Sequence, residues 1–122
     1  MSRSRVGLGR RGEEIAAQRL TSRGYRIVAR NWRCAAGEVD IVAQHGLVWA
    51  FVEVRTRRGT RFGTPEESIT PAKQARMIDV ALCYLAEHEI DKVDWRLDLV
   101  AVELDRAGRL VRVEVLENAV EG

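Results

Sequence analysis

Two acidic residues interrupt apolar stretches of the sequence and are the first candidates for chemistry. Asp40 lies within the stretch 39–43, and Glu53 lies within the stretch 48–54. A carboxylate is costly to bury in such surroundings unless a cation meets it. Both residues are therefore candidate ligands of a cation.

The segments that carry these residues predict two β-strands joined by a short turn, which would bring the carboxylates together. If His45-Gly46 is the centre of the turn, paired positions sum to 91, so Glu38 lies opposite Glu53 and Asp40 lies opposite Phe51. Side chains alternate along a strand, so the three carboxylates then share one face of the sheet. Asp40 and Glu53 become diagonal neighbours about 7 Å apart at the backbone.

Carboxylates that gather without histidine or cysteine suit a hard cation such as Mg²⁺ or Mn²⁺. Mg²⁺ takes one or two carboxylates together with water and phosphate oxygens, so the expected substrate is a phosphodiester. The other interpretation is that Glu38, Asp40 and Glu53 cover a solvated sheet face or pair with arginines. The residues alone leave these two interpretations open.

Arginine is concentrated in the first part of the chain and predicts a nucleic-acid partner. Residues 1–76 carry 15 basic and 7 acidic side chains, whereas residues 77–122 carry 5 and 11. Guanidinium groups suit bidentate contact with phosphate oxygens, although a GC-rich genome also produces arginine-rich proteins. The expected phosphate contacts are Arg57, Arg58, Arg61 and Lys73.

The elements that must position these residues follow the order αβββαββ. Apolar spacing predicts a helix over 10–23, strands over 25–32, 38–44 and 47–55, and a long helix from Pro71, capped by Thr70, to about Glu87. Strands over 95–104 and 109–116 complete one α/β domain spanning 1–122, with a loose basic leader at 1–9. The sheet is expected to be mixed and flanked by helices.

Composition excludes a membrane-spanning protein and indicates a cytoplasmic one. The longest uncharged stretch, 41–52, has only twelve residues and contains Gln44, His45 and Gly46. No apolar segment follows the basic start before Glu13, so no secretory signal is expected. Two cysteines make neither a disulfide framework nor a metal motif, which suits a reducing compartment.

Several short motifs together resemble one family of small bacterial proteins. These motifs are GRRGE at 9–13, RNWR at 30–33, GEVDIV at 37–42, FVEVRTR at 51–57 and RLDLV at 96–100. In order and spacing they look like the YraN-like family across nearly the whole chain. That family is similar to the restriction-endonuclease-like superfamily and, within it, to archaeal Holliday-junction resolvases.

The resemblance implies a metal-dependent nuclease site that acts on branched DNA, and it suggests a homodimer. By motif position, Glu13 matches the helix acid of the superfamily, Asp40 its strand aspartate and Glu53 the acid of its Glu-x-Lys motif. These three would hold Mg²⁺. Arg55 stands where the motif has lysine, and a guanidinium stays charged and cannot act as a general base. The expectation is therefore an endonuclease-like protein with weakened cleavage, and the alternative is a nucleic-acid-binding module without catalysis.

Overall fold

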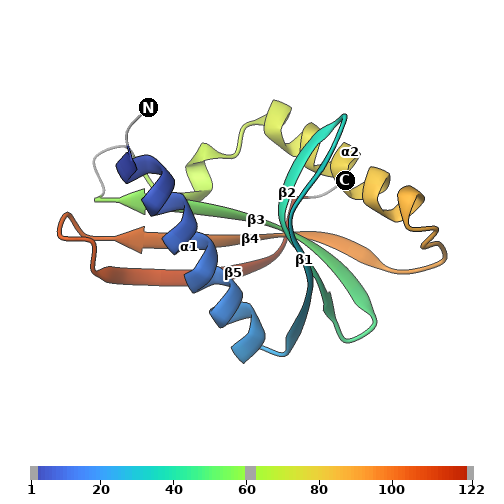
Figure 1. Cartoon of the computed structure of the whole chain (residues 1–122), viewed down its shortest axis with the longest axis horizontal. Coiled ribbons are helices and arrows are strands. Elements are labelled where there is room, and N and C mark those ends of the chain that lie inside the picture. The colour runs from blue at the N-terminus through green and yellow to red at the C-terminus, as the bar shows by residue number, and fades with distance from the viewer. Residues whose placement is uncertain (1–2, 60–62, 121–122) are drawn as a thin grey trace.

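One five-stranded mixed sheet with a helix on each face forms the protein in this computed structural model, which describes residues 3–59 and 63–120 (Figure 1). The strands lie in the order β1-β2-β3-β4-β5, with β3 and β4 parallel and the other neighbours antiparallel. The predicted order αβββαββ and the α/β class are confirmed. The elements are α1 (Arg3–Ser22), β1 (Tyr25–Cys34), β2 (Gly37–His45), β3 (Val48–Arg58), a 3₁₀ turn η1 (Glu66–Ser68), α2 (Pro71–Glu87), β4 (Trp95–Leu104) and β5 (Leu110–Val120).

The two helices bury opposite faces of the sheet because side chains alternate along the central strands. Val52 faces α1 in one core cluster, and its neighbour Phe51 faces α2 in the other. The second helix begins as predicted, because Thr70 Oγ1 accepts a hydrogen bond from Lys73 N at 3.1 Å and Pro71 is the first helical residue. This helix lies mainly over β1, β2 and β3.

The first helix starts earlier than predicted. Residues 3–9 are helical rather than a loose leader. Leu8 packs against the core on the α1 side, and this tertiary contact outweighs the low helix propensity of Gly7 and Gly9. Gly12 lies against Thr56 so closely that a Cβ at this position would overlap the threonine side chain. The missing side chain therefore lets α1 approach the end of β3.

The β2–β3 turn also differs from the prediction. His45 pairs with Val48, so Gly46 and Leu47 form the turn and paired positions sum to 93 instead of 91. Gly46 has a φ of 64°, which favours glycine. Asp40 is therefore not opposite Phe51, which pairs with Val42. The shift of two positions preserves the alternation of faces within the ladder, which runs from Ile41 and Val52 to the turn and does not include Asp40.

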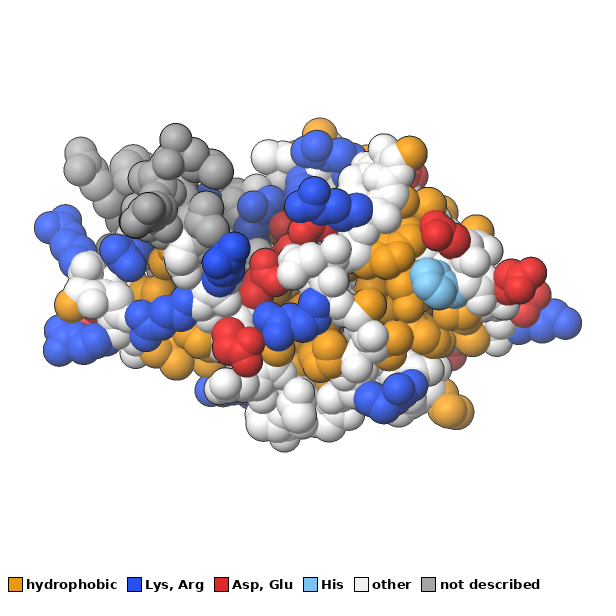
Figure 2. Space-filling model, viewed as in Figure 1, with side chains coloured by type: hydrophobic (Ala, Val, Ile, Leu, Met, Phe, Trp, Pro, Cys, Tyr) orange, Lys and Arg blue, Asp and Glu red, His pale blue; other side chains and the backbone are white. Residues whose placement is uncertain are grey.

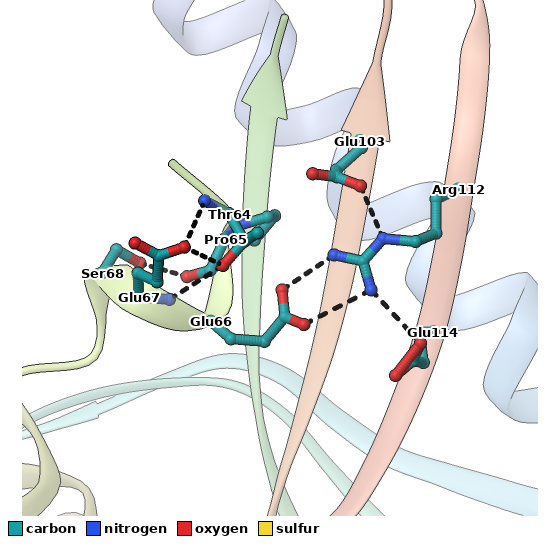
Figure 3. A network of polar contacts seen from close by, with 8 residues as sticks. All are labelled: Thr64, Pro65, Glu66, Glu67, Ser68, Glu103, Arg112 and Glu114. Atoms are coloured by element: carbon teal, nitrogen blue, oxygen red, sulfur yellow. Dashed lines mark hydrogen bonds and ion pairs between the residues drawn. The ribbon is translucent and has the colours of Figure 1, made fainter. Parts of the chain in front are cut away.

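A polar network fastens η1 to the far strands of the sheet. The guanidinium of Arg112 contacts Glu66 at 2.8 Å, Glu103 at 2.5 Å and Glu114 at 3.2 Å (Figure 3). The hydrogen bonds from Arg112 lower the pKa of Glu66. The segment between β3 and α2 is thus anchored on β4 and β5, which fixes where α2 begins.

Candidate functional site

Asp40 lies where β2 and β3 stop pairing. The ladder between these strands ends at Ile41 and Val52. Beyond it, the Asp40 carboxylate accepts a hydrogen bond from the backbone N–H of Val54 at 2.8 Å, replacing the strand partner that is lost. The side chain is thereby fixed at the fork between two strands.

The electrostatic surroundings of Asp40 are unfavourable for its charge. Burial, followed by the negative charge of Glu53, raises its pKa to about 7, and the charges of Glu13 and Glu38 act in the same direction. The hydrogen bond from Val54 offsets only part of this effect. The carboxylates that the sequence singled out therefore interact around Asp40.

Glu53 is buried on the α2 face, and two cations contact one of its oxygens. Glu53 Oε2 lies 3.3 Å from Arg55 Nε and 3.3 Å from Lys73 Nζ. The contact with Arg55 is an ion pair without hydrogen-bond geometry. Glu53 and Glu38 also line the same small cavity beneath Met77, so the expected shared face holds for this pair. The predicted register is wrong, because Glu38 pairs with Arg33 on β1 and does not lie opposite Glu53.

The placement of Lys73 could not be anticipated from its sequence position. The structure brings its ammonium from the first turn of α2 to the Glu53 carboxylate, and its expected contact with phosphate stays a prediction. Where α2 begins relative to the sheet depends on tertiary packing, which hydrophobic spacing does not specify. The sequence signal was limited to the helix cap at Thr70 and Pro71.

The carboxylates fit a hard cation through their oxygen donors and through the unfavourable charge at Asp40. In the part of the chain that the structure describes, no group of three or more His, Cys, Asp and Glu side chains is arranged as a ready metal cluster. A pair of carboxylates is nevertheless sufficient for Mg²⁺, which fills its other positions with water and substrate oxygens. Asp40 and Glu53 would hold such an ion, with Glu13 contributing charge from α1.

Arginines gather at the end of the sheet where β3 ends and β4 turns into β5 (left in Figure 2). Arg11 on α1 donates a hydrogen bond to the carbonyl of Gly108, and the Arg58 guanidinium lies beside the same glycine. Arg57 is half-buried, and its buried Nε has no hydrogen-bond partner among the described residues. The predicted contact Arg61 lies outside the described residues.

Sequence reasoning missed the contribution of α1 and of the β4–β5 turn to this basic end. Arg106 lies beside Gly59, and Arg109 is 81% exposed while it pairs with Asp105. Both arginines belong to the acidic part of the chain, so summing charge by sequence halves concealed them. The sequence DRAGR at 105–109 was the available signal, because a turn of this kind exposes its side chains.

Asp98, a second buried acidic residue, has its hydrogen-bond partners within the fold. Asp98, which is fully buried, accepts hydrogen bonds from Tyr25 Oη at 2.8 Å, Arg96 Nε at 3.0 Å and Asn118 N at 2.8 Å. Arg96 and Asp98 therefore form an ion pair within β4. The contact between Arg96 and His45 at 2.6 Å extends the network to the turn after β2.

Comparison with known proteins agrees with the motifs. Residues 12–102 match the family model described as Uncharacterised protein family UPF0102. A UPF0102 protein of Roseiflexus castenholzii is 48% identical over 122 residues, covering 99% of this chain and 98% of its own. One from Symbiobacterium thermophilum is 49% identical over 112 residues, which cover 92% of this chain and 94% of the relative. One from Acidothermus cellulolyticus is 53% identical over 91 residues, which cover 75% of this chain and 69% of the relative.

No helix among the described residues is long and apolar enough to cross a membrane. The chain belongs to the UPF0102, or YraN-like, family, whose restriction-endonuclease-like relationship agrees with this fold.

Proposed function

We propose that this protein binds structured, branched DNA and hydrolyses its phosphodiester bonds with the help of Mg²⁺ or Mn²⁺ at Asp40 and Glu53. The observation that carries this proposal is the position of Asp40, which is fixed at the fork between β2 and β3 among other carboxylates. Burial and the charge of Glu53 raise its pKa there. A bound cation would offset the repulsion between these carboxylates, so the charge arrangement favours cation binding.

The ion would supply charge neutralisation at the phosphorus oxygens and an activated water. The chain's own residues position the substrate. Arg55 and Arg57 follow Glu53 at alternate positions of β3, so the three residues form one row on the α2 face. A phosphate backbone that lies along this row contacts two guanidinium groups beside the carboxylates.

A second group of arginines lies at the end of the sheet, where α1 reaches the β4–β5 turn. Arg11, Arg58 and Arg106 come from three different elements and lie around the same turn. Such a cluster attracts nucleic acid independently of its sequence. A cytoplasmic location, to which the free thiols Cys34 and Cys83 are suited, and a homodimer that acts on a two-fold junction remain parts of this proposal.

A second candidate is a nucleic-acid-binding module without catalysis. The specific observation in its favour is that Glu53 already has two cationic partners, Arg55 and Lys73. These contacts compete with a metal ion for the carboxylate. A guanidinium also cannot exchange protons with water, which leaves Arg55 able only to orient groups or stabilise charge.

Cleavage assays on the parent protein and the Arg55→Lys variant separate the two candidates. On a junction or flap substrate with Mn²⁺, Arg55→Lys should cut faster than the parent, because it introduces an ammonium that exchanges protons. Asp40→Asn in the same background should abolish the activity while preserving side-chain shape. If no variant cuts duplex, single-stranded or branched DNA although calorimetry shows bound metal, the nuclease proposal fails and the binding module stands.

A further inference from the structure

An open hollow of about 460 Å³ lies beside the carboxylate site on the α2 face of the sheet. Its floor includes Leu99, which pairs directly with Glu53 across the β3–β4 ladder. Met77 lines both this hollow and the small cavity at Glu53. The hollow exists because α2 lies mainly over β1–β3 and leaves this face of β4 and β5 uncovered. The hollow and the cavity at Glu53 are therefore neighbours.

The walls of the hollow suit a flat apolar group with polar edges. Leu99, Met77 and Leu116 provide apolar surface, whereas Gln74, Glu66 and Glu117 provide hydrogen-bonding groups. No Lys or Arg occurs among the described residues that line it. Arg112 and Arg96, which do not line the hollow, are already paired with Glu66 and Glu117, so a phosphate would face carboxylates here and is an unsuitable occupant.

The acidic groups of the wall are held in place by other residues. Arg112 binds Glu66 through two nitrogens, and Arg96 contacts Glu117 at 3.2 Å. Anchored carboxylates still present lone pairs to a ligand and need little reordering when it binds. The hollow is therefore largely formed in advance, as small-molecule sites commonly are.

We propose that this hollow receives an unpaired nucleobase that is turned out of the strand whose phosphate lies at Asp40 and Glu53. This inference rests on the proposed function and defines its substrate as nucleic acid with an unpaired nucleotide beside the reacting bond. With phosphates aligned over β3, bases project to one side or the other. The β1–β2 side is covered by α2, so the open side over β4 and β5 is the one that can accept a base.

The wall also predicts which bases enter. Glu66 and Glu117 accept hydrogen bonds from amino groups, and the Gln74 amide both donates and accepts. Adenine, cytosine and guanine carry exocyclic amino groups, whereas thymine carries none. A thymine at the unpaired position should therefore bind more weakly than the other three bases.

The test uses DNA with one unpaired 2-aminopurine and reads both binding and the surroundings of the base. Ala119 lies exposed at the rim of the hollow, and Ala119→Phe should fill it. Expected results are a severalfold change in 2-aminopurine emission when the parent binds, and about tenfold weaker binding of this DNA by Ala119→Phe, as for the loss of one stacked base. Binding of a fully paired duplex should stay unchanged. The matched control Ala86→Phe adds the same side chain at an exposed position of α2 that does not line the hollow, and it should behave as the parent.

Three results would overturn the inference, and they can be told apart. If Ala119→Phe binds unpaired and paired DNA as the parent does, the hollow is not a base site, although nucleic-acid binding survives. If Ala119→Phe changes the oligomeric state in size-exclusion chromatography, the hollow is an interface between copies. If the parent binds no nucleic acid in any form, the proposed function fails and this inference fails with it.

Discussion

Asp98 on β4 and Asp40 on β2 are both largely withdrawn from solvent, but their carboxylates have different numbers of hydrogen-bond partners. Asp98 receives hydrogen bonds from a tyrosine, an arginine and a backbone N–H. Asp40 receives one backbone hydrogen bond and faces the negative charge of neighbouring carboxylates. A buried acid with internal partners strengthens a fold, whereas one without them stores unfavourable free energy that a bound cation can release.

Tyr25, on the α1 side of the sheet, is part of the network that stabilises Asp98. Burial, followed by the hydrogen bond to Asp98, raises the pKa of Tyr25, so its hydroxyl remains a donor throughout the physiological range. The Tyr25 ring stacks on His45 with centroids 4.1 Å apart. The network around Asp98 therefore joins β1, β2 and β4 by contacts that need no external ligand.

The same substitution at both aspartates sharpens the comparison, and the largest expected effect is at Asp98. Asp98→Asn removes the charge that pairs with Arg96 and turns one accepting oxygen into a donor facing other donors. We expect the free energy of unfolding to fall by about 3 kcal/mol or more. Chemical denaturation at pH 7 measures it, and a loss below about 1 kcal/mol would show that this network contributes little to stability.

Asp40→Asn should instead raise the free energy of unfolding at neutral pH. Its side-chain oxygen can still accept the hydrogen bond from Val54, but the repelled charge is gone. The folded-state pKa of about 7 is above the ordinary value for aspartate, so the protonated acid stabilises the fold at low pH. That stability is fully present below about pH 4 and is lost as the pH rises through 7.

The variant should therefore match the parent near pH 4 and exceed it above pH 7 by about 2–4 kcal/mol in unfolding free energy. Denaturation curves from pH 4 to pH 8 without divalent metal measure this difference. If the difference in unfolding free energy between variant and parent is the same from pH 4 to pH 8, Asp40 does not ionise in this range. The contrast with Asp98 would then be lost.

A smaller effect is expected at Lys73, which compensates part of the charge of Glu53. Lys73→Met should raise the affinity for Mn²⁺ about fivefold, because one cation that competes for the carboxylate is removed while Arg55 stays. Lys92→Met is the matched control, since Lys92 is exposed and has no ion pair among the described contacts. Weaker binding of Mn²⁺ by Lys73→Met would mean that the lysine supports the metal site instead of competing with it.

How far the sequence predicts the structure depends on whether a feature is local. The extent of α2 and of β4 followed from the cap at Thr70, the apolar stripe and the β-branched run, and the structure agrees with both. The start of α1 and the β2–β3 turn were wrong because Leu8 and His45 are fixed by distant partners. The position of Lys73 at Glu53 depends on how α2 lies on the sheet, which no local pattern specifies.

Proton release on metal binding tests the central claim most directly, namely that Asp40 and Glu53 form a cation site. Calorimetric titration of Mn²⁺ at pH 6, repeated in buffers of different ionisation enthalpy, gives the number of protons released. With a pKa of about 7, Asp40 should release close to one proton at pH 6, much less at pH 8, and none when it is replaced by asparagine. Absence of Mn²⁺ binding at millimolar concentration, or binding to Asp40→Asn as tightly as to the parent, would contradict the claim.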